Sequence, residues 1–494
     1  MPFVYNFPFF SIFLCMVSAI LLSVSKNRRF NYCWTLFVSM ACTVLSAVLL
    51  VRLMASGESF AYTMGKFPAP FGNEIKAGPL QALFAACFSF VMFFSILGGK
   101  DDLFRDVPER KYGLACVMQC MTLASLLVLT YTNDIFTGYV FIEISTIAAC
   151  ALVMIRDESE TLISTIRYLF MSLLGSGLFL FGVVILYGIT GHLLMPQLSE
   201  KISGLVSSGS NKAQLAASLA MITIGLGVKS GMYPFHRWLP WAHGTATTSS
   251  SAILSGLVLK GYVVLLITVY CRVFTLDVVR EIGVNYIVFA LGLLEMIVAS
   301  LYAMKQSNIK HMLAYSSVAQ LGYIFMGIGL GTEAGVAAAC FQVIAHACTK
   351  SLLFCTAGRL DGVTDFNKEL RALRGSARRA PLAGIAFGVG ALSMIGIPLF
   401  AGFTSKMNFA LAEDGWKSIL MLAALVISSV LNAMYYLPAV LSIWAESDAK
   451  VTWEYEKKDV FYGIAAIVLI AAVVALGTCF APVMKVIEAG LGLM

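Results

Sequence analysis

The chain has 494 residues, of which 59% are hydrophobic and only 12% charged, and its mean hydropathy is +0.85. Soluble domains carry about 25% charged residues, so this composition excludes an ordinary globular protein. The net charge of +7 does not indicate nucleic-acid binding, because the Lys and Arg residues are scattered over short loops and form no basic stripe with interleaved aromatic residues.

Apolar stretches long enough to cross a lipid bilayer follow one another along the chain. A membrane-spanning helix needs about 20 mainly apolar residues, and a helix keeps its backbone groups paired where lipid cannot. The sequence therefore predicts an all-α polytopic membrane protein of about fourteen spanning helices, with no soluble domain. We expect these helices at residues 8–25, 33–54, 78–98, 113–132, 135–155, 167–190, 213–235, 248–270, 283–304, 309–330, 333–357, 381–408, 417–444 and 460–484.

Glycine and proline interrupt the seventh and the twelfth predicted helices. Gly231 and Pro234 stand in the seventh, and Gly396 and Pro398 stand in the twelfth. Such breaks free backbone groups that only protein or water can satisfy. Breaks five helices apart predict two inverted five-helix repeats with ion sites at the breaks. The expected domains are three N-terminal helices at 1–112, a first repeat (helices 4–8) at 113–270, a second repeat (helices 9–13) at 283–444 and a C-terminal helix 14 at 445–494.

Lys and Arg are unevenly divided between the two sides of this predicted bundle. The loops after odd-numbered helices hold 21 of them, whereas the loops after even-numbered helices and the C-terminus hold nine. Cytoplasmic loops of membrane proteins carry the excess of positive charge. We therefore expect a multi-pass protein of the cell (inner or plasma) membrane, with both termini on the non-cytoplasmic side.

Ionisable residues also lie inside the predicted helices, where a charge costs at least about 2.5–3.5 kcal/mol. For a single lysine near a helix end, such as Lys406, the simpler interpretation is an amine that reaches the headgroups or a static ion pair. Lys229 and Lys260 lie too deep to reach the headgroups easily. The whole set therefore favours a transport role: Glu143, Lys229, Lys260, His346, Lys350 and Lys406.

These residue types have the chemistry of a proton relay. A buried lysine changes between its charged and neutral forms as a carboxylate approaches or withdraws, and histidine titrates near neutral pH without such help. His346 precedes Lys350 by four residues and shares its helix face. Groups of this kind, joined by water, carry protons through membranes.

No motif in the sequence indicates a cofactor or a metal. The twelve cysteines lie nearly all in apolar stretches and form no Cys-x-x-Cys pair, so we interpret them as small buried apolar residues. Gly-rich phosphate-binding loops and haem-ligand pairs do not occur either. An enzyme that binds quinone, flavin or a nucleotide is therefore the weaker hypothesis, and any redox chemistry is expected on partner subunits.

Six motifs, in their order and spacing, resemble the antiporter-like subunits shared by respiratory complex I, membrane-bound hydrogenases and Mrp-type multisubunit sodium/proton antiporters. The resemblance covers about residues 80–440. Length, the segment after helix 6 and a lysine at position 406 make the D-type subunit of Mrp antiporters the most similar member. The motifs are NDIFTGYVFIEIST, GVKSGMYPFHRWLPWAH, AILSGLVLKGY, SNIKHMLAYSSVAQLGYI, AHACTKSLLF and GIPLFAGFTSK.

The resemblance implies a role for each buried ionisable residue. It implies that Glu143 pairs with Lys229 and that protons then pass Lys260, the helix-11 residues His346 and Lys350, and Lys406. His236 and His243 match the loop after helix 7, where a purely structural turn remains the alternative. The chain departs from the family at Trp241, in the segment GTATTSSSA, and at Gln320 and Gln342, and these changes affect proton uptake near helix 8 and the route through helices 10 and 11.

The resemblance implies a membrane subunit that moves protons, in exchange for Na⁺ if it is an antiporter, together with other membrane subunits. Three alternatives stay open: a proton-pumping subunit of a complex I-like NADH dehydrogenase or of a membrane-bound hydrogenase, a non-conducting scaffold, and a solute carrier. Whether the chain is part of an enzyme depends on which assembly contains it.

Overall fold

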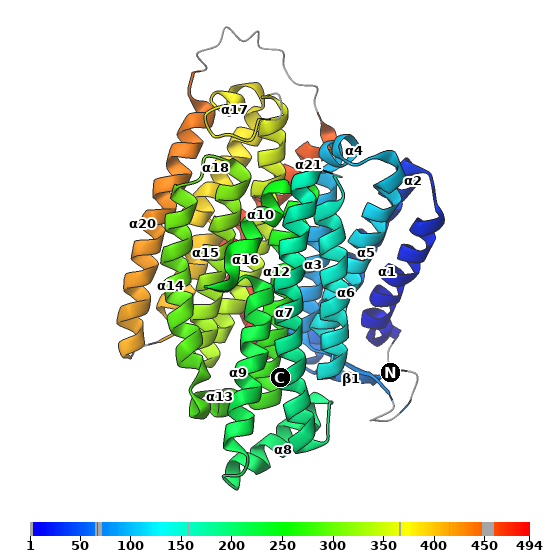
Figure 1. Cartoon of the computed structure of the whole chain (residues 1–494), viewed down its shortest axis with the longest axis vertical. Coiled ribbons are helices and arrows are strands. Elements are labelled where there is room, and N and C mark those ends of the chain that lie inside the picture. The colour runs from blue at the N-terminus through cyan, green and yellow to red at the C-terminus, as the bar shows by residue number, and fades with distance from the viewer. Residues whose placement is uncertain are drawn as a thin grey trace.

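The computed structural model describes residues 3–64, 67, 72–156, 158–364, 367–413, 415–446 and 459–494. Long helices stand side by side in one bundle, and two short strands, β1 (Phe60–Thr63) and β2 (Glu74–Ala77), pair as an antiparallel hairpin at one end of it (Figure 1). Inside lipid, only helices and closed barrels keep all backbone groups paired. The predicted all-α membrane fold is confirmed.

Thirteen helical spans among the described residues are long and apolar enough to cross a membrane. The remaining predicted crossing, the twelfth at 381–408, consists of two shorter helices. The long spans are Phe3–Val24 (η1, Phe3–Asn6, and α1, Phe7–Val24), α2 (Arg28–Ser56), α3 (Pro79–Gly98), α5 (Glu109–Tyr131), α6 (Ile135–Met154), α7 (Ser159–Thr190), Lys212–Thr245 (α9, Lys212–Ser230; η3, Phe235–Arg237; α10, Trp238–Thr245), Thr248–Phe274 (α11, Thr248–Ile253; η4, Leu254–Val258; α12, Leu259–Thr268; η5, Val269–Phe274), α14 (Val284–Met304), α15 (Ile309–Leu330), α16 (Glu333–Gly362), α20 (Trp416–Trp444) and α21 (Val460–Thr478).

Both predicted breaks are present. α9 ends at Gly231, whose φ of 81° suits glycine, and α10 follows after a short turn. α18 (Pro381–Ile395) ends in the same way at Gly396, with φ 90°, and α19 (Ala401–Ala410) follows. α9 begins at the end of the bundle that holds α8, whereas α18 begins at the opposite end, beside α17 (Figure 1). The two broken helices therefore run in opposite directions, as inverted repeats require.

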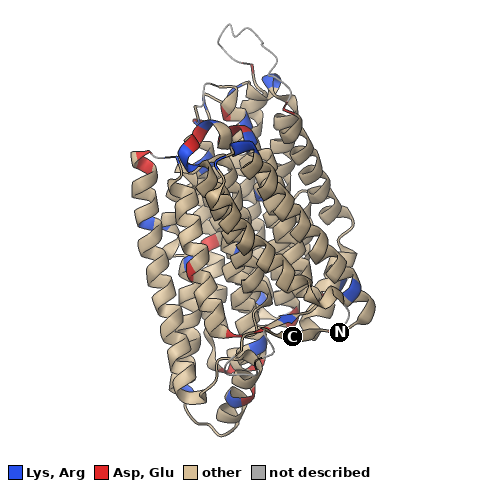
Figure 2. Cartoon of the chain, turned by 90° about the vertical axis from the view of Figure 1, so that its right-hand side faces the viewer, with Lys and Arg blue, Asp and Glu red and all other residues tan. Residues whose placement is uncertain are grey.

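Lys, Arg, Asp and Glu residues gather toward the two ends of the bundle, and the ribbon between the ends is mostly of other residues (Figure 2). One end holds α4 (Lys100–Asp106) and α17 (Ser376–Arg379), and we call it the α17 end. The opposite end, called the terminal end, holds the β-hairpin, α8 (Met195–Ser207), α13 (Leu276–Ile282) and both chain termini (Figure 1). Four of the counted loop lysines lie outside the described residues: Lys66, Lys450, Lys457 and Lys458.

Short helices occupy stretches that we predicted as connections. α8 lies in the predicted connection 191–212 and buries Met195, Leu198 and Ile202 on one face, which is the spacing of an amphipathic surface helix. The predicted last helix at 460–484 is also different. It divides into α21 and α22 (Ala481–Gly492), because a proline in the first turn of α22 suits a helix start rather than a helix interior.

The innermost helices are buried entirely by the others. The most apolar parts of Thr248–Phe274 and of α16 are 100% buried within the protein, whereas those of α2 and α20 are 33% buried. The outer helices therefore face lipid, and polar side chains on the inner helices are shielded from it.

α14 and α15 approach so closely that their backbones touch at two glycines. A Cβ at Gly292 would lie 2.4 Å from the Met326 nitrogen, and a Cβ at Gly322 would lie 2.8 Å from the Gly292 oxygen. Because such overpacking typically costs about 1–3 kcal/mol, we expect Gly292→Ala to lower the thermal unfolding midpoint of the solubilised protein. Gly177→Ala is the matched control, since a Cβ there meets nothing within 4 Å; equal midpoints for the two variants would contradict this expectation.

Candidate functional site: a line of buried amines

Lys229 and Glu143 form an ion pair between α9 and α6. The Lys229 amine lies 3.5 Å from the Glu143 carboxylate, and the lysine side chain has no exposed surface. This distance exceeds the roughly 2.7–2.9 Å of a charge-assisted hydrogen bond, and the amine's shorter contact, 2.7 Å, is with the Thr146 hydroxyl. Lys229 therefore keeps a hydrogen-bond partner whether or not the ion pair is closed.

Tyr262 on α12 packs against the Lys229 amine. Its ring centroid is 5.5 Å from the Lys229 amine, within cation–π range, and its hydroxyl donates to Ser145 at 3.3 Å. Tyr262 follows Lys260 by two residues on α12. Because residues two apart on a helix do not face each other, the Tyr262 ring is a partner of Lys229 on the helix that carries Lys260, and it does not itself join the two amines.

Lys260 is connected to α15 by polar contacts. Its amine donates a hydrogen bond to the Ser255 carbonyl oxygen, which belongs to the π-helical turn η4 that joins α11 to α12; single π turns are frequent at functional sites. The Ser255 hydroxyl lies 2.7 Å from the Ser317 hydroxyl, and Ser317 donates to the Leu313 carbonyl oxygen at 2.9 Å. This chain of contacts ends at the Leu313 carbonyl oxygen, which also accepts a hydrogen bond from the next buried lysine.

Lys350 on α16 reaches the same carbonyl oxygen. Its amine is 2.8 Å from the Leu313 oxygen and 3.3 Å from the Tyr436 hydroxyl on α20. Lys229, Lys260 and Lys350 are each 0% exposed. The alternative in which these amines reach the headgroups is therefore wrong for all three.

His346 is buried one turn before Lys350 and lies close enough to Lys260 and Lys350 to interact with both electrostatically. Among the described residues, neither ring nitrogen has a hydrogen-bond partner. Gln342 donates to the Gln320 oxygen at 2.7 Å. The two glutamines, at positions where the resemblance implies histidines, thus bind each other, and glutamine cannot titrate.

Lys406 on α19 folds back over the end of α18. Its amine lies 2.6 Å from the Ile395 oxygen, 3.5 Å from the Met394 oxygen and 2.8 Å from the Ser429 hydroxyl. The last carbonyl groups of a helix lack intrahelical donors and carry partial negative charge. The ammonium group therefore stabilises the break while remaining directed into the protein.

α20 connects Lys350 with Lys406 through polar side chains that our sequence predictions did not include. Next to Lys350's tyrosine partner, Tyr435 donates its hydroxyl to the Asn432 oxygen at 2.6 Å. The Asn432 amide donates to the Met394 carbonyl oxygen at 3.2 Å, the atom that Lys406 also approaches. Polar groups therefore extend across the second half of the bundle.

The two histidines after the break in α9 are placed differently from the lysines. His236 is 3% exposed and lies among tyrosine rings, and neither of its nitrogens has a partner among the described residues. His243 is 1% exposed, stacks on Phe354 at 5.4 Å, and is close enough to Lys260 and Lys350 to interact with both electrostatically. His243 thus joins the line of amines, whereas His236 lies apart from it.

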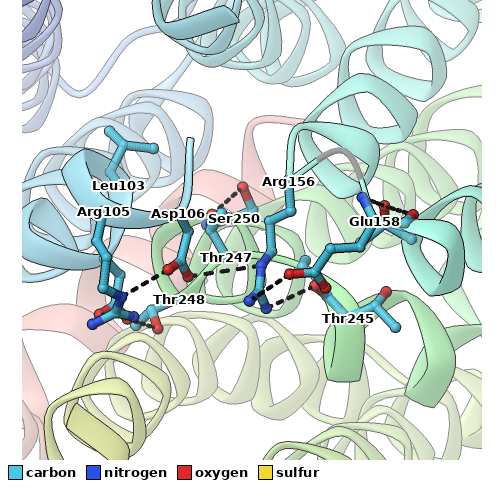
Figure 3. A network of polar contacts seen from close by, with 12 residues as sticks. Leu103, Arg105, Asp106, Arg156, Glu158, Thr245, Thr247, Thr248 and Ser250 are labelled. Carbon is cyan, nitrogen blue, oxygen red and sulfur yellow. Dashed lines mark hydrogen bonds and ion pairs between the residues drawn. The ribbon is translucent and has the colours of Figure 1, made fainter. Parts of the chain in front are cut away.

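A network of ion pairs holds the connection between α10 and α11 at the α17 end (Figure 3). Arg156 contacts Glu158 at 2.9 Å and the Thr245 oxygen at 3.4 Å, and its Nε lies 3.7 Å from Asp106. Thr248 donates a hydrogen bond to Asp102. The hydroxyl-rich segment GTATTSSSA (244–252) is therefore fixed by charged residues of α4 and of the α6–α7 connection.

A hollow of about 520 Å³ opens beside this connection at the α17 end. Thr245, His311 and Lys368 line it with two glutamates, Glu160 and Glu369. Burial, reinforced by the neighbouring Lys310 and Arg156 charges, lowers the pKa of Lys368 to about 8. The hollow places a group that titrates near physiological pH close to the segment that leads to Lys260.

The described residues contain no group of three or more His, Cys, Asp or Glu side chains placed to hold a metal ion. The twelve cysteines are free thiols. The polar interior consists of amines, imidazoles, carboxyl groups, hydroxyls, amides and carbonyl oxygens, which can bind protons or water.

Comparison with known proteins places this arrangement in a family. A family model described as NADH:quinone oxidoreductase/Mrp antiporter, TM, matches residues 132–432, more than half of the chain. NADH-quinone oxidoreductase subunit N of Desulforudis audaxviator is 31% identical over 429 residues, which cover 86% of this chain and 83% of that protein. The D-type subunit of the Na(+)/H(+) antiporter of Bacillus subtilis is 27% identical over 494 residues, which cover 96% and 94%.

Solved structures share the fold. A chain of the Mrp complex from Dietzia sp. DQ12-45-1b superposes with a TM-score of 0.87 at 19% identity, covering 100% of this chain and 97% of that one. A chain of respiratory complex I from Thermus thermophilus gives 0.74 at 21% identity, covering 97% and 100%. The broken helices, the buried lysines and the sequence match together show that this chain belongs to the family of membrane subunits shared by NADH:quinone oxidoreductases and Mrp antiporters.

Proposed function

We propose that this chain is the proton-carrying membrane subunit of a multisubunit cation/proton antiporter that exchanges H⁺ for a cation such as Na⁺. The observation that supports it most is the line of polar contacts that joins Lys260, Lys350 and Lys406 across the buried centre of the bundle. Amines shielded from lipid and unpaired with carboxylates are expensive to keep charged, so they gain from alternating between charged and neutral forms.

The proposed relay starts at the Glu143–Lys229 pair and ends at Lys406. The carboxylate favours the charged form of Lys229 when it approaches and favours proton release when it withdraws. The later amines bind mainly to carbonyl oxygens, so each proton leaves its lysine for water. The residues with a proposed role in this relay are Glu143, Lys229, Lys260, His346, Lys350 and Lys406, with His243 beside Lys260 and His236 at the break.

The α17 end is proposed to face the cytoplasm, with both termini on the non-cytoplasmic side. The loops assigned to this end carry 21 Lys and Arg residues, against nine in the loops of the other end and the C-terminus, and cytoplasmic loops carry the excess of positive charge. The partners are proposed to be further membrane subunits, since the similar structures come from an Mrp complex and from respiratory complex I.

A second candidate is a subunit of a redox-driven proton pump, and the 31% identity to an NADH-quinone oxidoreductase subunit N favours it. The match to a D-type antiporter subunit over 96% of the chain favours the antiporter. The two functions differ in their driving force, because only an antiporter dissipates a proton gradient on addition of Na⁺ alone.

The test is proton flux in vesicles that contain the whole complex with Lys260→Met. We expect the variant to assemble normally and to lose proton flux at least about a hundredfold, as removal of a proton-transferring group does. Lys212→Met is the matched control, because this lysine lies at the terminal end with 65% of its side chain exposed. A scaffold would keep its flux in both variants, and a solute carrier would require an organic substrate.

A further inference from the structure

Glu295 is a buried carboxylate that no part of the proposed relay uses. It lies at the centre of α14 and is 0% exposed, and among the described residues neither of its oxygens has a hydrogen-bond partner. No ion pair joins it to a cation within those residues. An ionised carboxylate in such a place is costly, so the side chain is held as a neutral acid until water or a cation reaches it.

The carboxyl group faces the break between α9 and α10. The polar group that approaches it is the backbone of Tyr233, within the interruption itself. Seven residues later, nearly two turns along the same face of α14, Tyr302 stands 6.1 Å from the His236 ring. Glu295 and Tyr302 thus both lie against the broken helix, one at mid-membrane and one nearer the α17 end.

His236 lies beside Tyr302 and follows Tyr233 by three residues at the break. Its ring lies 5.7 Å from Tyr233 and 6.3 Å from Tyr315, and it is buried with both nitrogens unpartnered among the described residues. The His236 imidazole and the Glu295 carboxyl group, both without a hydrogen-bond partner among the described residues, therefore lie at the same interruption between α9 and α10. Buried polar groups are normally paired with protein or water, so two of them at one break indicate a hydrated, proton-exchanging site.

We propose that Glu295 is a proton-binding residue of the transport cycle that exchanges protons with the α17 end through His236. Through water, the imidazolium N–H bond of His236 breaks and an O–H bond forms on the Glu295 carboxylate, which leaves a neutral imidazole and a neutral acid. The reverse transfer releases the proton. This inference rests on the proposed function and adds to it a carboxyl group on the first helix of the second repeat.

The experiment uses the whole complex in vesicles and compares Glu295→Gln, Glu295→Asp and the control Glu281→Gln, which alters an exposed glutamate paired with Lys212. We expect Glu295→Gln to lower proton flux about a hundredfold, Glu295→Asp to restore most of it, and the control to match wild type. The infrared band of a protonated carboxyl group should be present in wild type, absent in Glu295→Gln, and shifted rapidly when H₂O is replaced by D₂O.

The outcomes separate this inference from the proposed function. If Lys229→Ala is inactive while Glu295→Gln transports normally, Glu295 is a structural residue and only this inference fails. A carboxyl band that resists exchange with D₂O also overturns it, even if the glutamine variant does not assemble. If Lys229→Ala itself transports normally, the proposed function has failed.

Discussion

Replacing Lys229 by alanine is expected to abolish proton flux through the assembled complex, a loss of about a hundredfold or more. The lysine is fully buried, and it is the group that the Glu143 carboxylate approaches to 3.5 Å. Without the amine there is no proton acceptor in this place. Glu143→Gln should have the same effect, because the Lys229 amine then lacks the carboxylate whose approach and withdrawal control its proton binding. The measurement is pH change inside vesicles that contain the purified complex.

A double variant distinguishes transport from assembly at this pair. Removing one partner of a buried ion pair destabilises a protein by about 3–5 kcal/mol because the other charge is left uncompensated, so each single variant should also unfold at lower temperature. Glu143→Gln with Lys229→Met removes both charges, and we expect it to regain thermal stability without regaining flux. A double variant that transports protons would contradict the relay.

Lys406→Arg is expected to assemble normally and to lose proton flux about a hundredfold or more. Lysine at this position stabilises the free carbonyl oxygens at the end of α18. Arginine retains the positive charge and the donors, so it preserves that contact, but it does not release its proton in proteins. Normal flux in this variant would mean that Lys406 only holds the break together.

Lys406→Ala completes this test. It removes both the charge and the stabilising contact, so we expect loss of flux together with a lower unfolding temperature. Comparison of the two variants in the same thermal and transport assays therefore separates a proton carrier from a structural cap.

Much of the architecture was predictable because only helices and closed barrels can cross a lipid bilayer with all their backbone groups paired. Apolar stretches located the spanning helices, and Gly/Pro pairs located both breaks, since these residues act on the local backbone. The family resemblance correctly implied the contact of Glu143 with Lys229. The short helices α8 and α13 were missed because an amphipathic turn at a membrane surface has the composition of a loop.

The polar links between the amines were harder to predict. Asn432 and Tyr435 are neutral, so they do not stand out in an apolar helix as a charge does, and their role depends on which face α20 turns inward. Glu295, in contrast, was predictable, because it is an ionisable residue at the centre of a predicted spanning helix, as Glu143 is. No family motif contains it, and reliance on those motifs left it out.

The carbonyl oxygens that hold the three later amines have a consequence for the resting membrane. A carbonyl oxygen accepts a hydrogen bond but has no hydrogen to give, so the contacts of these amines with Ser255, Leu313 and Met394 do not by themselves pass hydrogen ions onward. On the proposed function, we therefore expect the subunit to leak little current at rest, so that an idle transporter would not discharge the voltage of the cell.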